Sequence, residues 1–231
     1  MTTDLRGRHV VVTGGTGALG RAVVSRLVEA GAFCHVPSRR APEAAAPHPY
    51  VTLHTVADLS EDAAVSQLYD NVPELWASIH LAGGFVMAPI VETDKAALMG
   101  QLNTNFISCF LCCRAAAKAI AKTGRGGRIV NVAARPALEW RTGAGMTAYA
   151  ASKAAVAALT AALAEEVAKD GILVNAVAPS IIDTPANREA MPKANHAAWP
   201  KVEEVAATIA FLASPENAVT RGGVIPVYGK S

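Results

Sequence analysis

The sequence predicts an α/β protein built on one doubly wound, mostly parallel sheet of about seven strands, with helices on both faces. Short runs rich in β-branched residues alternate with helical segments as far as the end of the 231-residue chain. A glycine-rich turn, residues 14–20, joins the first such run to the first helical segment. Neither a shift of composition nor an internal repeat marks a boundary, so we expect residues 1–231 to form a single domain.

The composition limits the function classes. Hydrophobic residues make up 52% of the chain, charged residues 17%, and the net charge is +2. These values exclude intrinsic disorder and argue against a polybasic nucleic-acid binder. The longest apolar region, residues 106–121, is interrupted by Arg114 and Lys118, so we expect no membrane span. Residues 1–8 are polar and residues 10–13 are too short for a signal-peptide core, which predicts a cytoplasmic protein.

Three of the four cysteines, Cys109, Cys112 and Cys113, lie close together on one predicted helix. A thiolate metal site is one interpretation. No second Cys or His pair at metal spacing accompanies them, and cysteine is a good small core residue, so we expect no metal. His80 is expected to be a core residue for a similar reason. Reduced cysteines favour a reducing compartment.

The first β-branched run, residues 9–13, leads directly into the glycine turn and then into a helix over residues 18–30. Glycines in this position allow a tight turn and let a pyrophosphate approach the helix N-terminus, which predicts a bound dinucleotide. The alternative is a tight turn that binds nothing.

The second strand, residues 32–37, runs into Ser38, Arg39 and Arg40. An NAD-selective site usually has an acid here to hold the ribose 2′-hydroxyl, and this chain has none. Two guanidinium groups would attract a 2′-phosphate, so we predict NADPH in preference to NADH. The alternative is two solvated surface arginines. Residues 42–49 are expected to form a surface loop.

The remaining elements follow in alternation. Strands are predicted at residues 51–56, 77–81, 128–132, 172–177 and 224–227, and helices at residues 61–71, 94–122, 149–169 and 201–213. Residues 181–200 are rich in Pro, Asn and Ala, show little regular pattern and are expected to form a mobile lid over a substrate.

Tyr149 and Lys153 lie four residues apart at the start of a long alanine-rich helix, so they share one face. A nearby cation favours the phenolate, so we expect Lys153 to lower the pKa of Tyr149. Such a tyrosine can protonate a carbonyl oxygen or deprotonate an alcohol. The alternative is one aromatic residue and one solvated lysine.

Several short motifs, in order and over essentially the whole chain, resemble the short-chain dehydrogenase/reductase family and its Rossmann fold. They are Thr13-Gly14 with Gly20, Asp58-Leu59, Ala82-Gly83, Asn105, Tyr149 with Lys153, Asn175 to Pro179, and Asp183 to Pro185. The resemblance implies catalytic roles for Tyr149 and Lys153, with Asn105 anchoring a proton-relay water. It implies that the cofactor contacts Gly14, Thr16, Gly17, Ala18, Leu19, Gly20, Ser38, Arg39, Arg40, Asp58, Leu59, Ala82, Gly83, Gly84, Tyr149, Lys153, Pro179, Ile182 and Thr184.

Three departures from the family pattern stand out. The family's usual glycine is replaced by Ala18, with Gly17 one position earlier. The usual Asn-Asn-Ala-Gly is here His80-Leu81-Ala82-Gly83, and the position of the catalytic serine holds Ala134. The dihydropteridine reductases also lack that serine, and this chain is similar to them in Gly14 to Gly20, in Ala82 to Gly84 and in a block from Asp183 to Trp199. The resemblance suggests that Ala134, Asn187 and Trp199 contact the substrate. The pair Arg39 and Arg40 departs from the animal enzymes of that subset, which carry an acid and prefer NADH.

These observations predict an NADPH-dependent reductase acting on a C=O bond or on an activated C=N bond, as in a quinonoid dihydropterin. Two alternatives stay open: a nucleotide-binding sensor without turnover, and an alcohol dehydrogenase working in the oxidative direction. The helices at residues 94–122 and 149–169 carry more apolar residues than one sheet face can cover, so a homodimer or homotetramer is expected. The expected partners are a small-molecule substrate and copies of the chain, without nucleic acid or membrane.

Overall fold

A seven-stranded sheet forms the centre of the protein. The computed structural model describes residues 4–40 and 48–231, so residues 1–3 and most of the expected loop at residues 42–49 lie outside the described part. The strands are β1 (His9–Thr13), β2 (Phe33–Ser38), β3 (Val51–Thr55), β4 (Leu75–His80), β5 (Gly127–Val132), β6 (Ile172–Pro179) and β7 (Val224–Val227). They pair in the order β3-β2-β1-β4-β5-β6-β7, and every pairing is parallel. The predicted fold class is confirmed.

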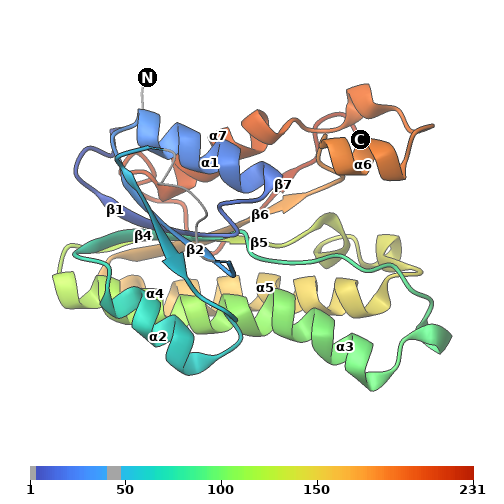
Figure 1. The fold of residues 1–231 in the computed structure, drawn as a ribbon, viewed down its shortest axis with the longest axis horizontal. Coiled ribbons are helices and arrows are strands. Elements are labelled where there is room, and N and C mark those ends of the chain that lie inside the picture. The colour runs from blue at the N-terminus through green and yellow to red at the C-terminus, as the bar shows by residue number, and fades with distance from the viewer. Residues whose placement is uncertain (1–3, 41–47) are drawn as a thin grey trace.

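Helices cover both faces of this sheet (Figure 1). On one face lie α1 (Ala18–Glu29) and α7 (Val202–Ala213), packed on inward residues such as Val10, Val12 and Ile79. The other face carries α2 (Asp62–Asp70), α4 (Ser108–Thr123) and α5 (Thr147–Glu166). The strands are apolar on both sides because both sides are covered, as expected for a parallel sheet.

The predicted helix at residues 94–122 is in fact three segments. These are α3 (Lys95–Gln101), a π-helical turn (Leu102–Ile107) and α4. A π-turn inserts one extra residue into the helical repeat and turns side chains to new directions. Here it holds Asn105 buried at 1% exposure, facing the loop after β4. The expectation of one continuous helix was wrong at the position that matters most for the site.

Residues 181–200 also contain more structure than predicted. The helix α6 (Pro185–Ala190) begins after Thr184, whose hydroxyl accepts a hydrogen bond from the Asn187 amide nitrogen at 3.2 Å. Proline at the first helical position and a threonine cap are standard helix-start signals. The expectation of little regular structure was therefore wrong for this short stretch.

Two helical segments, residues 95–123 and Thr147–Glu166, are long and apolar enough to cross a membrane by length and composition alone. Both belong to the layer below the sheet in Figure 1, so they serve as core helices in this structure. Only 39% and 33% of their most apolar windows is buried. The rest of each window is partly buried or exposed, and residues such as Leu159 and Leu163 still pack against the core.

Candidate active site at the carboxyl ends of the strands

A pocket of about 480 Å³ opens where β1 to β4 end. Ligands of parallel α/β sheets bind at this edge because the strand ends and the helix N-termini face it. The pocket is lined by Gly14, Thr16, Gly17, Pro37, Ser38, Arg39, Val56, Ala57, Asp58, Leu59, Ser60, Leu81, Ala82, Gly83, Asn103, Thr104 and Ser108. Nine of these residues were predicted from the sequence to contact the cofactor.

The glycine turn brings two backbone segments too close for side chains. Gly14 has φ +67°, and a Cβ there would lie 2.8 Å from the Ala82 nitrogen. A Cβ on Gly20 would lie 2.1 Å from the Gly14 carbonyl oxygen. Helix α1 starts at Gly17 without a side-chain cap and has no acid in its first turn. Its free N–H groups and positive dipole end therefore form an anion-binding position beside the pocket.

The end of β2 supplies the charge near this pocket. Ser38 and Arg39 line it. Arg39 and Arg40 are both exposed, but Arg40 lies outside the lining, its amide nitrogen 3.4 Å from the Ser38 hydroxyl. Across the pocket, Asp58 accepts hydrogen bonds from the Ser60 amide and hydroxyl, both at 2.8 Å. The Asp58 carboxylate is thereby held in one orientation.

Asn105 ties the loop after β4 to the helix of Tyr149. Its Oδ1 accepts from the Gly84 amide at 2.9 Å, and its Nδ2 donates to the Gly84 carbonyl at 3.0 Å and to the Ser152 hydroxyl at 3.1 Å. A third acceptor, Gln101 Oε1, lies at 3.3 Å. The Ser152 hydroxyl in turn donates to the Tyr149 carbonyl at 2.7 Å. Asn105 therefore acts on the site by fixing backbone.

Lys153 and Tyr149 come from the same face of α5, as their spacing predicts. The Lys153 ammonium donates to the Val132 carbonyl at the end of β5 at 2.8 Å, and it approaches Gly83 closely. Burial lowers the pKa of Lys153 to about 8. Burial raises the pKa of Tyr149 to about 12. The expected lowering of the Tyr149 pKa by Lys153 was wrong for the protein alone, because the loss of hydration outweighs the cation, which is turned toward Val132.

Tyr149 lies beside an apolar rim. The Phe85 ring meets it edge-on, with ring centroids 4.9 Å apart. Val86 and Met87 follow Phe85 and are more than half exposed. A second pocket of about 320 Å³ is lined by Val86, Ala88, Thr93, Ala97, Gly100, Gln101, Thr104, Met146 and Ala148. Ala134, at the predicted serine position, is 5% exposed and offers no hydroxyl.

Comparison with known proteins shows which family the chain belongs to. The family model described as short chain dehydrogenase matches residues 8–195. The chain belongs to the short-chain dehydrogenase family. Galactitol 2-dehydrogenase from Rhizobium johnstonii is 33% identical over 96% of this chain and 94% of its own length. L-xylulose reductase from Cavia porcellus is 30% identical over 99% and 98%. A solved structure, a short-chain type dehydrogenase/reductase from Mycobacterium ulcerans, has a TM-score of 0.88 at 24% identity, over 98% and 90% of the two chains, and shows the shared fold.

Membership of the short-chain dehydrogenase family confirms the prediction of an NAD(P)-dependent oxidoreductase acting on a small molecule. It also confirms the Rossmann-type architecture that the motifs predicted.

The segment after β6 holds the remaining predicted site residues. Pro179 ends β6, the Ile182 carbonyl accepts from Asn187 Nδ2 at 2.8 Å, and Thr184 caps α6. Trp199 is 7% exposed and stacks near His196, with centroids 4.6 Å apart. The structure brings neither Asn187 nor Trp199 to the two pockets described. Their contact with substrate stays a prediction.

Several site residues were missed from the sequence. Ser152 and Gln101 hold Asn105, Phe85 packs on Tyr149, and Thr13 accepts from the Ala82 amide at 3.2 Å. Ser152 lies between Tyr149 and Lys153 on the same helix, next to Lys153 in the sequence, and it is buried. Its position in this motif is the one signal that could have identified it. The other contacts depend on the π-turn and on strand order, which carry no local sequence signal.

Proposed function

We propose that this member of the short-chain dehydrogenase family is an NADPH-preferring reductase of a C=O or activated C=N bond, with Tyr149 as the proton donor. One observation carries the proposal. A pocket lined from Arg39 to Gly83 ends beside the buried Lys153 ammonium, and Tyr149, which is protonated at neutral pH, stands one helical turn before Lys153 on α5.

The residues fit a dinucleotide. Gly14 and Gly20 form a cradle that any Cβ would fill, and the N-terminus of α1 supplies free N–H groups for a pyrophosphate. Arg39 lies where a 2′-phosphate would be recognised, which supports NADPH over NADH. When bound, NADPH supplies the hydride. By the family pattern, Asp58 and Leu59 would hold the adenine, Lys153 the nicotinamide ribose, and Pro179, Ile182 and Thr184 the nicotinamide.

The protonation states suit reduction. With a pKa of about 12, Tyr149 carries its proton at pH 7 and can give it to the substrate oxygen or nitrogen. Lys153, with a pKa of about 8, is still mainly charged at that pH and stabilises the phenolate that forms. Asn105 positions Gly84 and the first turn of α5 through Ser152.

The surroundings of Tyr149 favour a flat, partly apolar acceptor. Phe85, which lies against Tyr149, is 57% exposed, and Met87, two residues later, is 64% exposed. Because Ala134 provides no second hydroxyl donor, a conjugated acceptor that is already activated loses less than a plain ketone does. A quinonoid dihydropterin-like ring is the proposed class, with residues 181–200, including Asn187 and Trp199, closing over it.

Single-turnover hydride transfer in the Tyr149→Phe variant tests the proposal. We expect a rate loss of about 10²- to 10⁴-fold, because a general acid contributes that much, with the dissociation constant for NADPH changed by less than about threefold. Stopped-flow absorbance of NADPH, with a quinonoid dihydropterin and a plain ketone as acceptors, gives the rate. A rate in Tyr149→Phe equal to that of the unaltered protein would refute the role of Tyr149.

Two rival functions are favoured by specific observations. The name of the galactitol relative suggests the oxidative direction on an alcohol. That function predicts faster NADP⁺ reduction with polyols than NADPH oxidation with ketones. The missing hydroxyl at Ala134 suggests a nucleotide-binding sensor, which predicts tight NADPH binding without consumption across carbonyls and quinonoid pterins alike.

We also propose a cytoplasmic homodimer or homotetramer formed by one folded domain. The helical segments at residues 95–123 and Thr147–Glu166 keep well over half of their most apolar windows unburied, and such faces pair across two-fold axes in helical interfaces. Light scattering of the purified protein tests this expectation, and a monomer at micromolar concentration would contradict it.

A further inference from the structure

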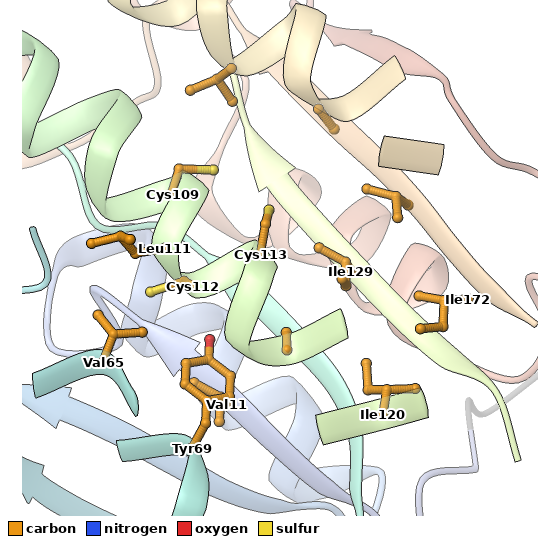
Figure 2. Packing of buried hydrophobic residues seen from close by; sticks show 14 of the residues in the cluster. Val11, Val65, Tyr69, Cys109, Leu111, Cys112, Cys113, Ile120, Ile129 and Ile172 are labelled. Atoms are coloured by element: carbon orange, nitrogen blue, oxygen red, sulfur yellow. The ribbon is translucent and has the colours of Figure 1, made fainter. Parts of the chain in front are cut away.

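A compact set of ligand-type atoms lies in the core, outside the proposed active site. His80 ends β4, Asn131 is its register partner on β5, and Cys109 and Cys113 face them from α4, one helical turn apart. Their exposures are 3%, 0%, 5% and 1%. Figure 2 shows the Cys109 and Cys113 sulfurs on the side of the helix that faces the strand of Ile129, and the Cys112 sulfur on the opposite side, toward Val65.

The four donor atoms lie close enough together to bind one ion. His80 Nδ1 is 4.0 Å from Cys109 Sγ and 3.5 Å from Cys113 Sγ. Asn131 Oδ1 is 3.3 Å from Cys109 Sγ, 3.4 Å from Cys113 Sγ and 2.8 Å from His80 Nδ1. The His80 nitrogen and the two sulfurs all lie within 4.8 Å of one another. Zinc bound to two thiolates, one imidazole and one oxygen sets ligand separations of about 3.4 to 3.8 Å, which these atoms reach if their separations change by up to about 1 Å.

The orientation of the Asn131 amide is set from outside the cluster. The Thr160 hydroxyl donates to the Val156 carbonyl at 2.8 Å, so it must accept from Asn131 Nδ2 at 2.9 Å. This fixes the Asn131 amide with its Oδ1 toward the cluster. That oxygen therefore points at the His80 imidazole nitrogen and the two thiols, where it is a neutral oxygen donor for a cation at the centre.

The outer partners of His80 suit a metal ligand. His80 Nε2 lies 2.8 Å from the Ser78 hydroxyl and 3.3 Å from the Tyr69 hydroxyl. A histidine that binds a metal through one nitrogen almost always donates from the other, and that second bond sets the ring orientation. With its proton on Nε2, His80 donates to Ser78 and turns the lone pair of Nδ1 to the cysteines.

We propose that Cys109, Cys113, His80 and Asn131 form a structural zinc site between α4 and the sheet. Two thiols each lose a proton to solvent as two metal–sulfur bonds form, while His80 and Asn131 bind as neutral donors. Two thiolates balance Zn²⁺, so the site is neutral, as a fully buried site requires. Soft thiolates with an imidazole in tetrahedral geometry select zinc over magnesium or calcium.

The metal would enter as the chain folds, since each of these side chains is at most 5% exposed in the folded protein. It would fasten α4 to β4 and β5 one helical turn after Asn105, behind the Lys153 network. The sequence argument against a metal relied on the lack of a histidine near the cysteines. The fold supplies that histidine from 29 positions earlier in the chain.

The test is metal content and cobalt spectroscopy of the whole protein. Protein produced in zinc-supplemented medium and dialysed against a chelator is analysed by mass spectrometry of metals. We expect about one zinc per chain in the unaltered protein and less than about 0.1 in Cys113→Ser. The matched control is Cys112→Ser, which changes an equally buried thiol on the same helix that faces away from the site; it should keep the zinc.

Refolding with Co²⁺ keeps the proposal testable if Cys113→Ser fails to fold. Unaltered protein should then show thiolate-to-cobalt charge transfer in the near ultraviolet and the strong visible bands of tetrahedral cobalt. The proposal is overturned by less than about 0.1 zinc per chain, by equal zinc in both variants, or by an intact mass 2 Da low that marks a disulfide.

Discussion

The ends of β1, β2 and β3 and the ends of β4, β5 and β6 form two halves of one edge, and they are built from different materials. In the first half the pocket wall is mostly backbone and short side chains, held by the close approach of Gly14 to Ala82. In the second half the proposed chemistry rests on side chains, those of Lys153, Asn105 and Tyr149, that come from neighbouring helices. Where two backbone segments are in contact, an added side-chain atom has no space. A site built from side chains can accept a different residue at one position. The difference explains how a change such as Ala134 can enter the second half without loss of the first.

The largest effect on the backbone-built half is expected from Gly14→Ala. The variant forces a side chain into φ +67° and places its Cβ 2.8 Å from two backbone atoms, Ala82 N and Leu81 C. We expect NADPH affinity to fall on the order of 10³-fold, because strain and a backbone clash add. Titration of NADPH fluorescence measures it. The control is Gly100→Ala, whose Cβ meets nothing within 4 Å. Affinity within about threefold of the unaltered protein in Gly14→Ala would show that the turn is not held by backbone contact.

Stability against acid should be set by the first half. His35 Nε2 lies 2.9 Å from His9 Nδ1, and His35 Nδ1 lies 3.0 Å from His54 Nε2, so three neutral imidazoles bridge β1, β2 and β3. Burial, and then His54 and His9, lower the pKa of His35 to about 4. Between pH 6.5 and 4 the unfolded chain binds a proton that the folded chain excludes, so stability is full above about pH 6.5 and falls toward pH 4.

The loss assigned to His35 is about 3 kcal/mol, since each unit of pKa corresponds to about 1.4 kcal/mol. Urea unfolding at a series of pH values measures it. His35→Leu should flatten the pH dependence, and His48→Gln, at an exposed histidine, should leave it unchanged. If the free energy of unfolding of His35→Leu fell with pH as steeply as that of the unaltered protein, His35 would not be the source of the acid sensitivity.

Charge recognition in the first half is tested by Arg39→Ala. Losing a charge-assisted contact to a 2′-phosphate should raise KM for NADPH roughly 10- to 100-fold and leave KM for NADH within about twofold. Arg40→Ala is the matched control, because Arg40 is exposed and lies outside the pocket lining. Steady-state kinetics with both cofactors give the four constants. Equal increases in KM for NADPH and NADH would show that Arg39 does not recognise the 2′-phosphate.

The sequence predicted the first half of the edge better than the second. The strands, the glycine turn and the Arg39 position are local features, and β1, α1 and β2 appear within one or two residues of their predicted bounds. The second half depends on contacts between distant segments. The π-turn that aims Asn105, the Ser152 contact and the meeting of His80 with Cys109 and Cys113 require the fold itself. The spacing correctly predicted that Tyr149 and Lys153 share one helix face. The expected lowering of the Tyr149 pKa was wrong, because Tyr149 is buried and the Lys153 ammonium donates to the Val132 carbonyl.

The smallest effect should come from returning a hydroxyl to the second half in Ala134→Ser. A second donor beside Tyr149 would stabilise the oxyanion that forms on a plain ketone, so the single-turnover rate with such a ketone should rise about tenfold. A quinonoid dihydropterin needs that donor less, and its rate should change by less than about threefold. NADPH affinity, set by the first half, should be the same in both proteins. An equal gain with both acceptors would mean that Ala134 limits turnover in general and does not select the substrate.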